Sequence, residues 1–132
     1  MSDSGFTSAE DRTMAMLAHL SGAAGYLLSF GMLTWLGPLL IYVFKREQSR
    51  FVAFHALQSL AFQLGWMAII AIGWWLTHLL TWVVIGVLLW PIMIILGFVP
   101  LVWSIYAGIQ AANGRWYDYP VAGEWARRTV GL

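Results

Sequence analysis

The sequence predicts an all-α membrane protein, a small transmembrane helix bundle of three full spans plus one short returning or re-entrant helix. Composition is the first reason: the 132-residue chain is 61% hydrophobic and 10% charged, whereas soluble domains contain about 25% charged residues. A soluble domain of this size has too little interior to bury so much apolar surface. The second reason is the placement of charge, because residues 13–44 and 51–114 contain no Asp, Glu, Lys or Arg.

The first helix is expected from about residue 9 to residue 28. Thr7 and Glu10 have the spacing of a capping box, in which Thr7 caps the helix and Glu10 bonds back to it. Small residues, among them Gly22 and Gly25, recur in this helix at intervals of three and four. Such spacing lets a second helix approach closely in a membrane, where no hydrophobic force holds helices together.

A short apolar segment, residues 34–44, follows and contains Gly37-Pro38. Proline fits the first turn of a helix, so a helix is expected to start at Pro38. At about 1.5 Å per residue, the segment reaches only about half way across the hydrocarbon core. It is therefore a short returning helix or a re-entrant one, and the sequence leaves both open.

The second charge-free stretch is expected to form a helical hairpin, because it is too long for one span of about 20 residues. Ser49 is a suitable N-cap for a helix over about residues 50–75. A turn is expected near residues 77–81, and the last helix over about residues 82–112. Asn113-Gly114 should end that helix, since both residues accept the left-handed conformation.

Pro91 and Pro100 lie inside the last helix. Each removes one backbone hydrogen bond and should kink the helix, which neighbouring helices can compensate in a membrane. The chain is thus expected to divide into a disordered N-terminal segment (residues 1–8), a transmembrane helical domain (9–114) and a cytoplasmic C-terminal tail (115–132).

Basic residues predict the orientation of the bundle. The loop of residues 45–50 and the C-terminal tail each carry Lys or Arg, whereas the expected turn at residues 77–81 carries none. Under the positive-inside rule, the loop, the tail and the N-terminus lie in the cytoplasm. The expected location is the bacterial inner (plasma) membrane.

A polar cluster is expected in the cytoplasmic half of the bundle. Five polar residues should lie at similar depth: His19, His55, Gln58, Gln110 and Asn113. An unpaired polar side chain in hydrocarbon costs several kcal/mol, so these side chains should face the bundle interior. Two interpretations stay open: they hold the helices together, or they line a shallow cytoplasm-facing cavity that receives a partner segment or a lipid headgroup.

Close helix packing is expected at a second group of residues, which share small side chains. They are Gly22, Gly25, Ser104, Gly108 and Ala112. Their spacing of three or four residues predicts contact with other helices, within the chain or between copies.

Catalysis, cofactors and metal binding are not expected. His55 and Ser59 share a helix face, but no intramembrane carboxylate is available to orient the imidazole. The chain has no cysteine, and its three histidines are scattered without a ligand spacing. A net charge of +1 also argues against a nucleic-acid partner.

Four short motifs carry a family resemblance. They are MLAHLSG (residues 16–22), LGPLL (36–40) leading to Lys45-Arg46, FVAFHALQ (51–58) and IQAANGRWYDYP (109–120). In this order they resemble a bacterial membrane-protein family of unknown function related to Tic-twenty, the polytopic component of the chloroplast inner-envelope import translocon. The resemblance implies a partner-binding or translocon-like membrane subunit.

Two functions follow as hypotheses. The first is a small polytopic membrane subunit or scaffold, Tic-twenty-like, that binds other membrane proteins or itself and is surrounded by the lipid bilayer. The alternative is an oligomeric conduit or translocon-like channel component for a polypeptide or small solute. Residues 67–72 and 92–96, which should lie near the midplane, are almost wholly apolar, so one copy cannot line a polar path.

Overall fold

The computed structural model describes residues 7–132, which contain five α-helices and no strand. The helices are α1 (Ala9–Ser29), α2 (Leu36–Lys45), α3 (Arg50–Thr81), α4 (Ile85–Ala112) and α5 (Ala122–Val130). The expectation of four helices is therefore wrong, because the C-terminal tail contains α5. The predicted disorder of the N-terminal segment falls largely on residues 1–6, outside the described residues.

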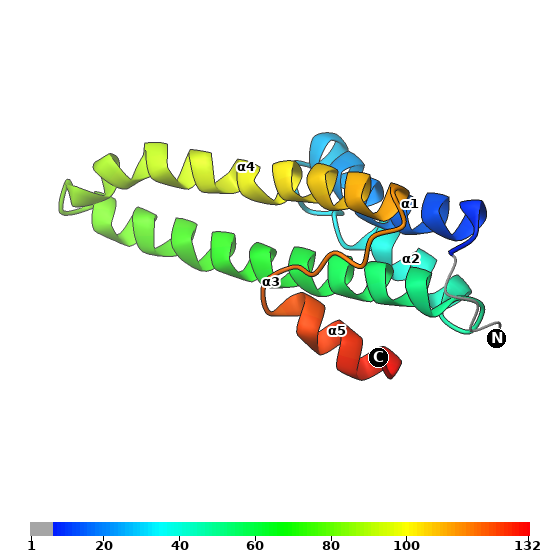
Figure 1. Cartoon of the computed structure of the whole chain (residues 1–132). Coiled ribbons are helices and arrows are strands. Elements are labelled where there is room, and N and C mark those ends of the chain that lie inside the picture. Colours follow the sequence, from blue (N-terminus) through cyan, green and yellow to red (C-terminus); the bar gives the residue numbers. More distant parts are fainter. Residues whose placement is uncertain (1–6) are drawn as a thin grey trace.

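The architecture is a long antiparallel hairpin of α3 and α4 with shorter helices around one half of it (Figure 1). α1 packs against α2, α3 and α4, while α2 also contacts α3. α5 packs on α3 alone. The half of the hairpin that ends at the α3–α4 turn extends beyond all three shorter helices (Figure 1).

Of the helices in residues 7–132, two are long and apolar enough to cross a membrane, α3 and α4. The prediction of three full spans is therefore wrong. α1 has 21 residues, but its first turn contains Glu10 and Asp11, and much of the rest is Ala, Gly and Ser. α2, with 10 residues, is too short to span.

The capping residue predicted from the sequence is confirmed for α3 and differs for α1. Ser49 caps α3, as expected, and its Oγ accepts a hydrogen bond from the Val52 amide at 3.4 Å. At α1 the cap is Ser8 rather than Thr7: Ser8 Oγ accepts from the amide of Asp11 at 3.0 Å. The N-cap of α1 therefore lies one residue later than the predicted capping box placed it.

The predicted turn at residues 77–81 is also wrong, because α3 continues to Thr81 and α4 begins only at Ile85. The polar side chains in this stretch bond to the preceding turn of their own helix and do not end it. Thr81 Oγ1 donates to the Thr77 carbonyl at 2.7 Å, and His78 Nδ1 donates to the Trp74 carbonyl at 2.8 Å.

Both prolines lie inside α4, which continues through them. Pro100 has no amide hydrogen, so the carbonyl of Leu96, four residues earlier, loses its helical donor. Trp66 on α3 replaces that donor: its indole Nε1 donates to the Leu96 carbonyl at 3.2 Å. A hydrogen bond from α3 therefore satisfies the carbonyl that Pro100 leaves without a helical donor.

Candidate functional site

A buried polar cluster joins α1, α3 and the segment after α4. Its members are His19 of α1, His55 and Gln58 of α3, and Tyr119 of the C-terminal tail. None of the four side chains exposes more than 1% of its surface. Residues 100 positions apart in the chain, His19 and Tyr119, thereby come into contact.

The hydrogen-bond partners determine which nitrogen of each imidazole carries the proton. His55 Nε2 lies 3.0 Å from the Arg115 carbonyl, which can only accept, so Nε2 donates. His55 Nδ1 then accepts from His19 Nε2 at 3.0 Å. His19 Nδ1 in turn accepts from the Tyr119 hydroxyl at 3.2 Å. The bonds form one directed chain in which both imidazoles are neutral.

Gln58 fixes the backbone of the tail. Its Nε2 donates to the Tyr117 carbonyl at 2.7 Å, and its Oε1 accepts from the Tyr119 amide at 3.0 Å. The same Nε2 lies 3.2 Å from His55 Nδ1. One glutamine therefore satisfies two backbone groups of a segment that has no regular secondary structure.

Aromatic packing completes the surroundings of Tyr119. Its ring stacks on Phe62 of α3 with centroids 4.2 Å apart, and Trp103 of α4 lies edge-on at 6.4 Å. Burial raises the pKa of the Tyr119 phenol above its usual value. The phenol therefore stays protonated and can serve as the donor to His19.

α5 is held on α3 next to this cluster. Arg127 binds the Asp118 carboxylate with two hydrogen bonds, at 2.7 and 2.8 Å, which raise the pKa of Arg127. Its guanidinium also lies 4.7 Å above the Phe54 ring centroid. Ala126 packs into the same place against Phe54 and Leu57.

These contacts satisfy the polar groups of the cluster within the chain. In the described part of the chain, every buried side-chain nitrogen and oxygen has a hydrogen-bond partner. Ser59 does not pair with His55: its Oγ donates to the Ala18 carbonyl of α1 at 3.0 Å. Residues 7–132 also contain no group of three or more His, Cys, Asp or Glu that could hold a metal ion.

The sequence model of the magnetosome magnetite crystal formation protein family matches residues 10–126. The chain belongs to this family. The matched range includes α1 to α4 and the polar cluster. The chain is also 30% identical over 119 residues to a UPF0132 membrane protein of Archaeoglobus fulgidus, covering 88% of this chain and 98% of that protein. No solved structure matches the chain.

These matches correct the resemblance to the Tic-twenty-related family, because neither the magnetosome family nor the archaeal relative connects the chain to it. The four motifs have structural reasons of their own. His19 and His55 belong to the buried cluster, and Pro38 lies in the first turn of α2. Gly114 has a positive φ of 72° just after α4. Short motifs with such roles do not identify a family.

Within this family member, the predicted polar residues separate into two groups. His19, His55 and Gln58 come together in the buried cluster. Gln110 and Asn113 do not join it. Gln110 Oε1 accepts from Arg115 at 3.1 Å, and Asn113 Nδ2 donates to the Ile109 carbonyl at 2.9 Å. Both lie at the end of α4, and their side chains bond to groups near the end of that helix instead of to the histidines.

Tyr119 is the cluster member that the sequence did not indicate. From the sequence it lies in a tail that was expected to be outside the helical domain. The only available signal was the run of aromatic residues directly after the end of α4, residues 116–119. Composition of that kind does not show that the tail turns back along the bundle.

The small residues have their close contacts inside the chain. A Cβ added at Gly22 would lie 2.6 Å from Gln63 Nε2, and one at Gly25 would lie 2.7 Å from the Leu33 carbonyl oxygen. At Gly108 the nearest atom would be in Leu20, at 3.2 Å. Ser104, also in the predicted group, accepts a hydrogen bond from Gln63 at 2.7 Å. Ala112, the last of the group, is half-buried at the end of α4.

Proposed function

We propose that the protein is a non-catalytic membrane subunit that binds another membrane protein, or a second copy of itself, through its C-terminal tail. The observation that carries this proposal is the buried polar cluster. Its hydrogen bonds hold residues 115–119 against α3, and its buried polar side-chain atoms all have hydrogen-bond partners within the chain.

A preformed tail suits partner binding because its conformation is already ordered before the partner arrives. The side of α5 away from α3 is exposed and carries Glu124 and Arg128, which form an ion pair with each other. Thr129 is exposed on the same helix. These side chains offer polar contacts next to the membrane surface on a helix that Arg127 and Ala126 hold in place.

The family description concerns magnetite crystal formation. We propose that any contribution of this chain to such a process passes through protein contacts. A mineral surface would be bound by free carboxylates, but four of the five acidic residues within residues 7–132, all except Asp11, form an ion pair with a basic residue. The oligomeric conduit has less support, because α3 and α4 of one copy form only a two-helix hairpin beyond α1 and α2 and would need several further copies to enclose a path (Figure 1).

The proposed location is the bacterial inner membrane, with residues 45–50 and both ends of the chain in the cytoplasm. Single cysteines at Gln48 and Thr129, in the cysteine-free chain, test this orientation with a membrane-impermeant maleimide. Both should react only when the cytoplasmic face is exposed. Reaction of the two from opposite faces would show that the proposed topology is wrong.

Photo-crosslinking in native membranes tests the partner-binding proposal. A photoreactive residue at Thr129 should give one discrete cross-linked protein band, either a partner or a dimer of this chain. The same residue at Ile72, an exposed position in the second half of α3, is the control and should give lipid adducts. Asp118→Ala should reduce the Thr129 product, because α5 loses its ion pair, whereas Asp11→Ala should not. Absence of a discrete product at Thr129 would refute the proposal.

A further inference from the structure

The charged residues of the tail determine where the hydrocarbon core can begin. Arg127 lies over Phe54, and Trp125 lines a cavity with Phe62 and Trp66. α5 therefore runs alongside the first half of α3, with Arg127 nearest the start of that helix, and its charges cannot lie deep in hydrocarbon. On α3 the hydrocarbon core begins near Phe62, and the first turns of the helix lie in the headgroup layer.

The rest of the hairpin has the length of one membrane crossing. From Phe62 to the end of α3 at Thr81 there are about 20 residues, or about 30 Å, which equals the hydrocarbon thickness. The hairpin turn exposes Trp82 almost completely. An exposed tryptophan is typical of a membrane–water interface, so the turn lies at the far surface.

α1 and α2 extend only about half as far into the hydrocarbon core as the α3–α4 hairpin does. α1 passes the depth of Ser59 at Ala18, since the two are hydrogen-bonded. Its last residue, Ser29, is about 16 Å further along the helix. Ser59 lies about 4.5 Å before Phe62 along α3, and this distance is subtracted because the core begins at Phe62. The turn between α1 and α2 therefore lies about 12 Å inside a core of about 30 Å.

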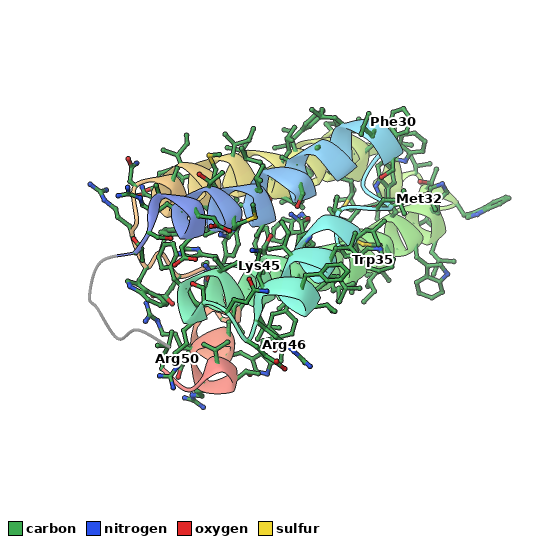
Figure 2. The ribbon with its side chains drawn as sticks, turned by 90° about the vertical axis from the view of Figure 1, so that its right-hand side faces the viewer. Phe30, Met32, Trp35, Lys45, Arg46 and Arg50 are labelled. Carbon is green, nitrogen blue, oxygen red and sulfur yellow. The ribbon has the colours of Figure 1, made fainter. Side chains whose placement is uncertain are left out.

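The side chains of this turn suit the middle of a bilayer. Phe30 is 96% exposed and Leu28 is 85% exposed, and Met32 is exposed beside them. Figure 2 shows Phe30 and Met32 at the far end of the α1–α2 pair, away from Lys45 and Arg46. Exposed apolar side chains at that depth contact lipid.

The backbone of the turn also satisfies its own polar groups, as hydrocarbon requires. Ser29 Oγ accepts from the Leu33 amide at 2.8 Å and donates to the Gly25 carbonyl at 2.5 Å. Thr34 Oγ1 donates to the Gly31 carbonyl at 3.2 Å. Trp35 Nε1 donates to the Met32 carbonyl at 3.0 Å.

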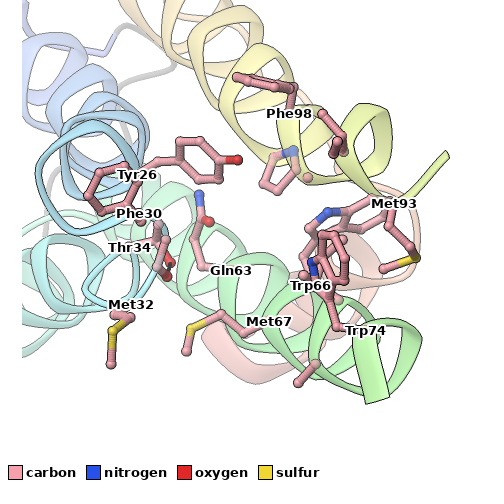
Figure 3. Close-up of a pocket in the computed structure, with 16 residues that line it drawn as sticks. Tyr26, Phe30, Met32, Thr34, Gln63, Trp66, Met67, Trp74, Met93 and Phe98 are labelled. Atoms are coloured by element: carbon pink, nitrogen blue, oxygen red, sulfur yellow. Dashed lines mark hydrogen bonds between the residues drawn. The ribbon is translucent and has the colours of Figure 1, made fainter. Parts of the chain in front are cut away.

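A cavity lies beside the α1–α2 turn, where the four-helix part of the bundle gives way to the α3–α4 hairpin alone. This cavity, of about 390 Å³, lies between the α1–α2 turn and the hairpin. Figure 3 shows Tyr26 and Phe30 on one side of it and Met93 and Phe98 of α4 on the other. The lining is mainly apolar, and lipid acyl chains would fill it.

We propose that α1 and α2 form a re-entrant wedge in one leaflet, so that the protein prefers membranes curved convexly toward the end that carries residues 45–50. Four helices occupy the near leaflet, and only α3 and α4 cross the far one. With a helix diameter of about 10–12 Å, the near leaflet contains about 160–220 Å² more protein cross-section. A protein that is wider in the near leaflet fits best in a membrane whose curvature expands the area of that leaflet. This inference concerns lipid alone and does not depend on the proposed partner.

The depth of the turn is tested first, on single cysteines at Phe30, Trp82 and Thr129 in reconstituted vesicles. The Phe30 cysteine should resist aqueous maleimide from both faces, and a fluorophore on it should be quenched most by lipids brominated near the bilayer centre. Thr129 and Trp82 should react from opposite faces. Reaction of the Phe30 cysteine from either face would overturn the wedge.

Curvature preference is then measured on membrane tubes pulled from giant vesicles that contain the labelled full-length chain. With the tail outside, we expect enrichment in the tube of about twofold or more over the flat membrane; with the tail inside, we expect depletion. Leu28→Lys with Phe30→Lys should draw the turn out of the hydrocarbon and abolish the difference. Trp82→Lys with Val83→Lys, at the far turn, is the matched control and should retain it. Equal density in tubes and flat membrane for the unmodified chain in both orientations would refute the proposal.

Discussion

Replacing Gln58 by leucine tests whether the buried cluster holds the tail. The substitution nearly preserves volume but removes both hydrogen bonds to the tail backbone, at 2.7 Å and 3.0 Å. The buried Tyr119 amide and the part-buried Tyr117 carbonyl then remain without these partners. Each such group costs about 1–3 kcal/mol, so the two together should destabilise the fold by about 2–6 kcal/mol.

The substitution should lower the free energy of unfolding of the whole bundle and should also loosen the tail itself. In the Gln58→Leu variant, we expect the Tyr119 amide to exchange its hydrogen much faster, and protease to cut first within residues 115–121. The unfolding free energy is measured in mild detergent with a denaturant titration, and amide exchange by mass spectrometry on the same sample. Both measurements are needed, because lower stability alone does not identify the tail.

Gln48→Leu provides the matched control. Gln48 is exposed in the loop before α3, and its side chain bonds to Lys45 and to the Phe44 carbonyl at the end of α2. An exposed substitution of this kind should change stability by about 0.5 kcal/mol or less. If Gln58→Leu behaved like Gln48→Leu in both measurements, the cluster would not be what holds the tail.

Three further perturbations follow from named contacts. Trp66→Phe should cost about 1–3 kcal/mol in detergent unfolding, because the Leu96 carbonyl beside Pro100 loses its donor. Gly25→Leu should cost at least about 1–3 kcal/mol by overpacking the α1–α2 turn, measured as a lower melting temperature. Stability should also fall as pH decreases through about 6.5, where a free histidine takes up a proton, because a second N–H on His19 or His55 would oppose an existing donor. A flat profile between about pH 7.5 and 5 would show that these imidazoles do not need to be neutral.

The all-helical membrane class could be predicted from the sequence because it depends on sums over many residues. The start of α3 at Ser49 could also be predicted, since a capping side chain bonds to an amide only three residues away. The end of α3 could not. Thr77 and His78 have the composition of a turn, but both continue the helix, and the side chains of His78 and Thr81 bond to carbonyls one turn earlier in it.

The tail shows why the remaining structure was missed. A helix of nine residues is not stable on its own in water, so α5 exists because Ala126 and Arg127 pack on Phe54. That contact joins positions more than 70 residues apart, and no local pattern predicts it. The same holds for Tyr119, whose place in the cluster depends on the tail turning back along α3 and α4.

The polar cluster and the proposed wedge constrain each other. The cluster lies where α1 and α3 leave the headgroup layer, a depth at which an unpaired polar group has little access to water. Its bonds to Arg115, Tyr117 and Tyr119 therefore hold the tail at one height along α3. At that height, the charges of α5 stop the bundle from sinking further into the membrane. The depth that the α1–α2 turn reaches thus depends on the hydrogen bonds that hold the tail as well as on the length of α1.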